Sequence, residues 1–141
     1  MKWRKVEDGY LVKLEMGEEM IGTLTAFARE QKIVGGVISG IGSVKNATIG
    51  IFSADLSQYI TKVYNDVLEV GNLNGNIAVS LEDDTPFIHC HVTAANEARG
   101  TISGHLFGAA VEVTMEIYIR VFSEKIVRLK DEATEYNIWE L

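Results

Sequence analysis

The stretch VEVTMEIYIRVF, residues 111–122, alternates apolar and polar side chains over its whole length. Alternation of this kind is typical of a β-strand with one face turned toward a core, because successive side chains point to opposite faces of a strand. The stretch is about twice as long as an ordinary strand, which predicts a long central strand or one bent by a β-bulge. Glu112 and Glu116 lie on its polar face, which we expect to meet water, a site or a subunit contact. The apolar face carries Val111, Val113, Met115, Ile117, Ile119 and Val121.

Further strand signals run through most of the chain. Apolar or β-branched runs, bounded by turn-forming residues, occupy 10–16, 37–41, 47–52, 59–64, 67–70, 77–81 and 87–94. The glycine-rich segment 40–43 is expected to be a turn. The segment 71–76 interrupts an otherwise continuous strand pattern, which indicates a bulge or a close approach between subunits.

One segment has the apolar spacing of an amphipathic helix. Glu18 and Glu19 are expected in its first turn, Gly17 is its candidate cap, and the pair Gly35-Gly36 ends the region. Its apolar stripe consists of Met20, Ile21, Leu24, Phe27 and Ala28. We therefore predict an α+β fold, with a mostly antiparallel β-sheet and one main α-helix packed on it.

The composition indicates one globular domain over residues 1–141. The chain has 47% hydrophobic residues and a net charge of −7, from 13 Lys+Arg and 20 Asp+Glu. No apolar run approaches the ~18 residues that a membrane-spanning helix needs, and acidic Glu7 and Asp8 stand where a secretory signal would be apolar. The only cysteine, Cys90, has no disulfide partner within the chain, which fits a reducing compartment. We expect a cytoplasmic protein.

The three histidines of the chain, His89, His91 and His105, all fall within seventeen residues. His89 and His91 are two apart on one predicted strand, so their side chains project from the same face and Cys90 points the other way, into the core. A hairpin centred on Ala98 would place His91 opposite His105, although a slip of one residue would turn His105 away.

Three converging imidazoles are the ligand set of a catalytic zinc site, because three nitrogens leave a coordination position open for water or substrate. We therefore predict a divalent metal, zinc, on His89, His91 and His105. The alternative is that these histidines only satisfy neighbours in the sheet.

Four motifs of the chain follow one another in a distinctive order: EVGNLNGNI at 69–77, PFIHCH at 86–91, GHL at 104–106 and VTME at 113–116. This order resembles a known family, the plants-and-prokaryotes conserved (PPC) domain. The resemblance implies an α+β domain that forms a homotrimer, is described as DNA-binding or DNA-associated, and in several prokaryotic members carries a metal on histidines that match His89, His91 and His105. Glu69 matches an acidic residue that in plant members contacts transcription factors.

Two departures from the family limit what the resemblance implies. Plant members have Gly-Arg-Phe before the acidic residue, whereas Asp66-Val67-Leu68 precedes Glu69 here, so the plant partner-binding role is not carried over. Plant members also hold DNA through a basic AT-hook with an Arg-Gly-Arg core, which this chain lacks. The net charge of −7 also disfavours direct DNA binding, because Lys and Arg contacts to phosphate supply most non-specific affinity. Assembly with a DNA-binding partner stays open.

The alternative function is a metal-dependent enzyme, a lyase or hydrolase acting on a small carbonyl or ester compound. The His-x-His followed by a later histidine is distantly similar to the zinc site of acetolactate decarboxylase. Glu69 or Glu116 is the candidate for moving protons if either lies within hydrogen-bond reach; otherwise each is a solvent-facing strand residue. A metal that only stabilises a subunit boundary would show the same sequence pattern.

Overall fold

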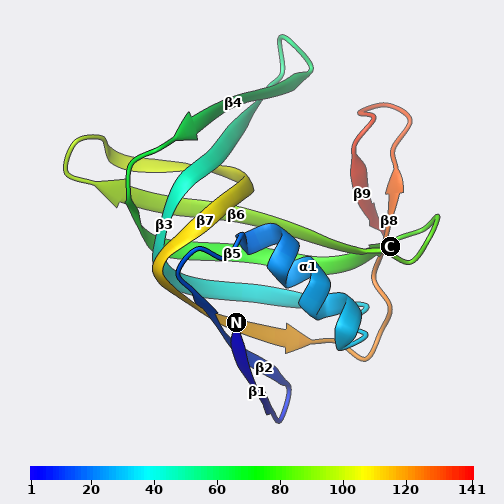
Figure 1. Cartoon of the computed structure of the whole chain (residues 1–141). Helices are drawn as coiled ribbons and strands as arrows, with labels where there is room; N and C mark the ends of the chain where they lie inside the picture. The colour runs from blue at the N-terminus through cyan, green and yellow to red at the C-terminus, as the bar shows by residue number, and fades with distance from the viewer.

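Nine strands and one helix make up the chain, and the computed structural model describes all residues from 1 to 141. All nine strands belong to one sheet (Figure 1). The single helix has neither the length nor the apolar character needed to span a membrane. The elements are β1 (Lys2–Val6), β2 (Gly9–Glu15), α1 (Met20–Glu30), β3 (Gly36–Ser53), β4 (Gln58–Tyr64), β5 (Leu68–Ser80), β6 (Pro86–Asn96), β7 (Gly100–Val121), β8 (Val127–Lys130) and β9 (Asn137–Glu140).

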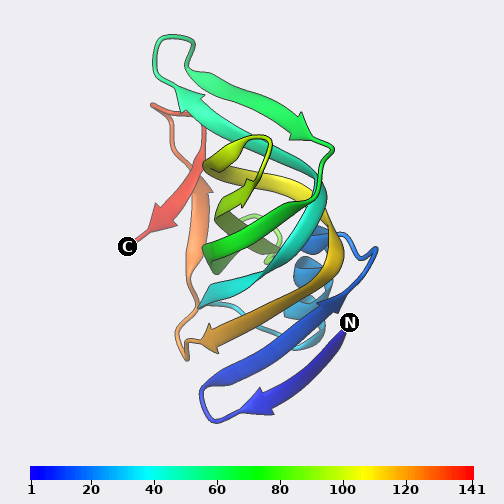
Figure 2. The ribbon, with the colours of Figure 1, turned by 90° about the vertical axis from the view of Figure 1, so that its left-hand side faces the viewer.

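Four strands close into a ring. β3 pairs with both β5 and β7, and β6 pairs with the same two strands, always antiparallel. The long strands β3 and β7 curve along the length of the molecule, which brings the ring together (Figure 2). β1 and β2 extend the sheet from β7, β4 extends it from β3, and β8, with β9 on its outer side, pairs in parallel with β5. The predicted α+β class is confirmed in its broad form: the chain is mostly antiparallel sheet with one short helix.

The helix α1 packs against β6 and β7 through the predicted apolar stripe. Phe27 and Leu24 are almost completely buried and belong to the main hydrophobic core. The predicted cap is wrong, however. Glu19 caps the helix, because its side chain accepts hydrogen bonds from the backbone N–H groups of Ile21 and Gly22. Gly17 instead forms the preceding turn, where its φ of +87° suits glycine.

The two longest strands each join segments that the sequence pattern separates. β7 contains residues 100–110 and the predicted run as far as Val121. Its apolar face is buried as expected except at Val113, which is 65% exposed, and at Val121, which is partly buried. β3 runs straight through the segment 40–43, so the predicted turn there is wrong. The register of β3 shifts against β5 just before Gly42 and against β7 just after it, and a Cβ at Gly42 would lie 2.1 Å from the carbonyl oxygen of Thr114. Glycine is therefore needed for a bulge and a close approach of two strands, not for a chain reversal.

The bulge predicted within 71–76 is confirmed at its first residues, where the register between β5 and β6 shifts between Val70 and Asn72. Three short strands, β1, β8 and β9, were not indicated by the sequence pattern. β8 lies close to the histidines. It pairs with β5, and β5 in turn pairs with β6, the strand that carries His89 and His91.

Candidate metal centre

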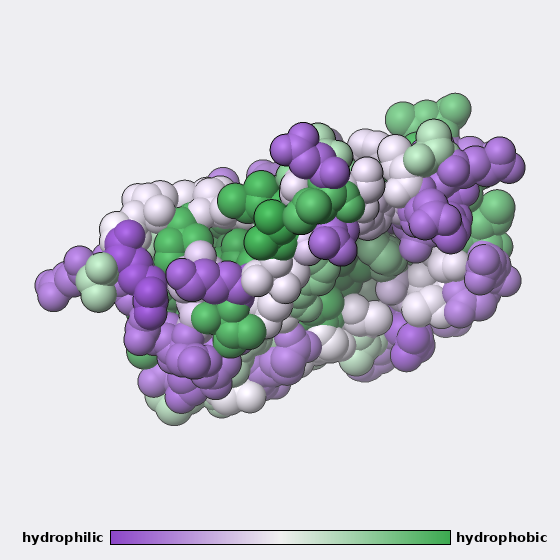
Figure 3. All heavy atoms as spheres, turned by 90° about the horizontal axis from the view of Figure 1, so that it is seen from above, coloured by the Kyte–Doolittle hydropathy of each residue, from purple (hydrophilic) through white to green (hydrophobic).

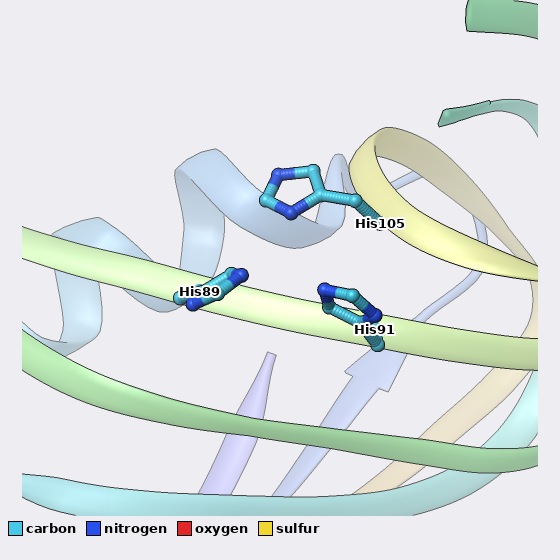
Figure 4. Close-up of side chains that lie close together, drawn as sticks. All are labelled: His89, His91 and His105. Atoms are coloured by element: carbon cyan, nitrogen blue, oxygen red, sulfur yellow. The ribbon is translucent and has the colours of Figure 1, made fainter. Parts of the chain in front are cut away.

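The three histidines come from two neighbouring strands. His89 and His91 project from β6, and His105 projects from β7. The predicted hairpin register is confirmed, because His91 pairs directly with His105. The ring centroids lie 4.9 to 5.4 Å apart, and one nitrogen from each ring lies within 4.8 Å of the other two. Figure 4 shows the three rings turned toward a common space.

The rings have the properties that a metal ligand needs. His105 Nδ1 is buried and has no hydrogen-bond partner, which a bound cation would satisfy. Burial, with the nearby Arg128 charge, lowers the pKa of His89 to about 4, and burial also lowers the pKa of His105. Both rings are therefore neutral at physiological pH and carry a free lone pair. Zinc–nitrogen bonds of about 2.0–2.1 Å in a tetrahedral site put ligand nitrogens roughly 3.3 Å apart, so the ring nitrogens, which lie within 4.8 Å of one another, would have to approach to hold the ion.

An arginine that the sequence did not indicate as part of the site lies within hydrogen-bond distance of His89. Arg128, on β8, is only 7% exposed. Its Nη2 lies 2.9 Å from His89 Nδ1 and donates to Asn76 Oδ1 at 3.0 Å, while Nη1 donates to the carbonyl oxygen of Asn137. The guanidinium also lies over the rings of Phe87 and Trp139. Burial lowers the pKa of Arg128, but an arginine stays charged at any physiological pH.

Two of the three histidines, His89 and His105, line a cavity of about 440 Å³, whereas His91 is exposed and is not part of the lining. The walls of this cavity come from the β3–β4 hairpin, β6, β7 and the β8–β9 hairpin, and the molecule is hollowed beside a hydrophobic patch when seen from above (Figure 3). Tyr59 lies at the centre of an aromatic wall, with ring centroids 5.2 to 5.7 Å from those of Phe52, Phe107, Tyr136 and His105. The complete lining is Phe52, Tyr59, Phe87, His89, His105, Phe107, Arg128, Thr134, Glu135, Tyr136, Asn137 and Ile138.

The two predicted proton-transfer candidates lie elsewhere. Glu69 is exposed on β5 and Glu116 is exposed on β7, and neither lines the histidine cavity. Glu116 instead lines a second cavity, of about 730 Å³, together with residues of β1, β2 and β3. Cys90 is fully buried on the opposite face of β6, as expected for a core thiol.

The family comparison agrees with this geometry. The Plants and Prokaryotes Conserved (PCC) domain, which is the PPC family that the motifs resemble, matches residues 1–123. The chain belongs to this family. Solved structures are similar to the chain over nearly its whole length. A metal-containing protein from Archaeoglobus fulgidus is 30% identical, with a TM-score of 0.85 and complete coverage of both chains. A candidate DNA-binding protein from Bacteroides thetaiotaomicron is 28% identical, with a TM-score of 0.91, over 99% of this chain and 96% of the other.

The distant similarity to acetolactate decarboxylase is confirmed at the level of the fold. The enzyme from Bacillus subtilis is 13% identical to the PCC-domain chain, with a TM-score of 0.57, over 88% of this chain and 57% of the enzyme. No curated protein matches the chain.

Proposed function

We propose that this PCC-domain protein binds one divalent metal ion, zinc, on His89, His91 and His105 and uses it on a small carbonyl or ester compound. The observation that carries the proposal is the three-histidine cluster, two members of which, His89 and His105, line the aromatic cavity. Three protein ligands and an open fourth position are typical of catalytic zinc, whereas structural sites are closed by four protein ligands. Zinc in such a site polarises a carbonyl or activates a water molecule. The fully covered relative from Archaeoglobus fulgidus, which contains a metal, supports metal binding.

Proton transfer at this metal needs a group that reaches the cavity. Glu69 and Glu116 keep the role that we proposed for them only if a second protomer brings one of them to the cavity, because neither lines it within one chain. The carboxylate that does line the cavity is Glu135, whose side chain is 80% exposed. Replacing each of the three glutamates by glutamine separates these alternatives once a substrate is in hand.

We further propose that the protein is a cytoplasmic homotrimer. Large hydrophobic side chains are exposed on the outer face of β2 and β3, among them Leu11 at 50% and Ile41 at 57%. Both also line the larger cavity. This part of the sheet is therefore a concave, exposed apolar surface of the kind that marks a contact with another protein chain. The buried, unpaired Cys90 is consistent with the cytoplasm.

Elemental analysis of tag-free protein tests the metal site. We expect one zinc ion per chain, in particles with three times the 15.6 kDa mass of the chain. His91→Ala is expected to lose the metal and keep the fold, because the His91 side chain is exposed. The matched control is Asn74→Ala, at the exposed position paired with His91 on β5, which should keep the metal. Equal zinc content in His91→Ala and the parent protein would refute the site.

A direct role in DNA binding is the second candidate, and the similarity to a candidate DNA-binding protein from Bacteroides thetaiotaomicron supports it. The net charge of −7 argues against it, because an acidic surface repels the phosphate backbone. The distribution of the basic residues over the fold is therefore decisive for DNA binding.

A further inference from the structure

We infer that the histidine cavity binds a small carboxylate with an apolar or aromatic body, and that Arg128 and the open position of the metal hold its carboxylate group. This inference rests on the proposed metal site and specifies its ligand. Three features of the structure carry it: a buried arginine without a counter-ion, the hydrogen bond between that arginine and His89, and the aromatic wall.

Arg128 is a buried charge that no carboxylate of the chain neutralises. None of the ion pairs in the structure includes it, and its hydrogen-bond partners on Asn76, Asn137 and His89 are all neutral. Its Nε atom is buried without any partner. Removing a charge from water is unfavourable unless an opposite charge compensates it, and a stacked aromatic ring compensates only in part. An anionic ligand would supply the missing partner.

The contact between Arg128 and His89 shows where that anion would bind. A guanidinium only donates hydrogen bonds, so His89 Nδ1 must accept and the ring hydrogen sits on Nε2. A metal on Nδ1 would use the same lone pair. A metal on Nε2 would move the hydrogen to Nδ1, where it would oppose the arginine donor. As long as His89 is a neutral ligand, metal binding on either nitrogen therefore releases an Arg128 N–H group beside the ion.

A released donor in a buried place needs a new acceptor, since an unsatisfied buried N–H is destabilising. A carboxylate fits this requirement best, because one of its oxygens can bind the open position of the metal while the other accepts from Arg128. Three neutral histidines leave the full charge of a divalent ion in place, so ion and arginine together make this part of an acidic protein strongly cationic.

The remaining walls select the body of the ligand. Phe52, Tyr59, Phe107 and Tyr136 surround one side of the cavity with aromatic surface, which a strongly hydrated inorganic anion would not use. The volume of about 440 Å³ lies in the range of small-molecule sites. The one carboxylate of the lining, Glu135, is 80% exposed and lies 3.7 Å from Lys130, so it does not neutralise Arg128.

Ligand binding to the cobalt-substituted protein tests the inference, because the visible spectrum of cobalt reports a change at its open position. Benzoate is the probe, benzamide its uncharged counterpart, and inorganic phosphate an anion without an apolar body. We expect benzoate to change the spectrum and to bind more tightly than benzamide and phosphate. Arg128→Gln should keep one cobalt ion per chain and weaken benzoate binding roughly 10–100-fold. The control Lys125→Gln removes an exposed cation paired with Asp84 and should leave benzoate affinity unchanged.

The outcomes separate the metal site from its ligand. Failure of the parent protein to take up cobalt or zinc refutes the proposed function itself. Full cobalt uptake with equal benzoate affinity in Arg128→Gln and the parent overturns the inference, as does equal binding of benzamide or phosphate. If Arg128→Gln does not fold, Arg128→Lys decides, because it keeps the charge but loses the planar fork. The benzoate affinity of Arg128→Lys should be lower than that of the parent protein for benzoate but higher than that of the parent protein for benzamide. An unchanged benzoate affinity would contradict the role of Arg128.

Discussion

Cys90 and its neighbours in β6 show how one residue step changes the chemistry available to a side chain. His89 and His91 converge with His105, whereas Cys90 faces the core and is completely buried, which raises the pKa of its thiol to about 12. The thiolate is the reactive form, so the folded protein should not react with a thiol-specific disulfide reagent at mildly alkaline pH. After denaturation in guanidinium chloride, one thiol per chain should react. Rapid labelling of the native protein would mean that β6 opens readily or faces the other way.

The residues of the site differ in how well the sequence could reveal them. The histidine cluster could be predicted because strand parity and one hairpin register are local properties, and the pairing of His91 with His105 confirms both. The contribution of Arg128 could not be predicted. This arginine reaches His89 only because β8 pairs in parallel with β5, and no local pattern in a strand of four residues predicts a parallel partner far away in the chain.

At the scale of the elements, β5 offers a matched pair of glycines. A Cβ at Gly75 would lie 2.3 Å from the carbonyl oxygen of His89 and 2.6 Å from Cys90 Sγ, whereas at Gly71 the nearest atom is 4.0 Å away. Gly75→Ala should therefore lower the free energy of unfolding by about 1–3 kcal/mol, because β6 must move. Gly71→Ala should leave it unchanged or raise it slightly. Chemical denaturation measures both, and equal effects would show that β5 and β6 are not packed this closely.

The same elements show the limit of pattern reading. Periodicity correctly predicted α1 and most of the strand residues, because it depends only on which face is buried. The ends of the elements were harder to predict from the sequence. Gly40 and Gly42 have the composition of a turn, yet they lie in a continuous strand, since the partner strand β7 approaches them too closely for a side chain. A glycine at a bulge and a glycine at a turn look alike until the neighbouring strand is known.

At the scale of the whole molecule, the fold decides what the basic residues can do. The sequence has one basic group near each end of the chain that would be the natural contacts for DNA phosphates: Lys2, Arg4 and Lys5, and Lys125, Arg128 and Lys130. In the structure Lys2 lies 3.2 Å from Glu15, Lys125 is paired with Asp84, and Arg128 is buried in the histidine cavity. Arg4 and Lys5, both exposed on β1, are the members of these groups without an ion-pair partner.

Two such cations on a chain of net charge −7 do not form a binding surface for a polyanion, and a trimer would multiply the repulsion threefold. We therefore expect no retardation of duplex DNA in an electrophoretic assay at about 50 mM salt, where phosphate contacts are still strong. Retardation that weakens steeply as salt rises would contradict this expectation. The double variant Arg4→Gln with Lys5→Gln would then test the two unpaired cations of β1. Loss of the complex would assign DNA binding to β1, whereas its persistence would assign it to other exposed cations, such as Arg29, Lys32 or Lys62.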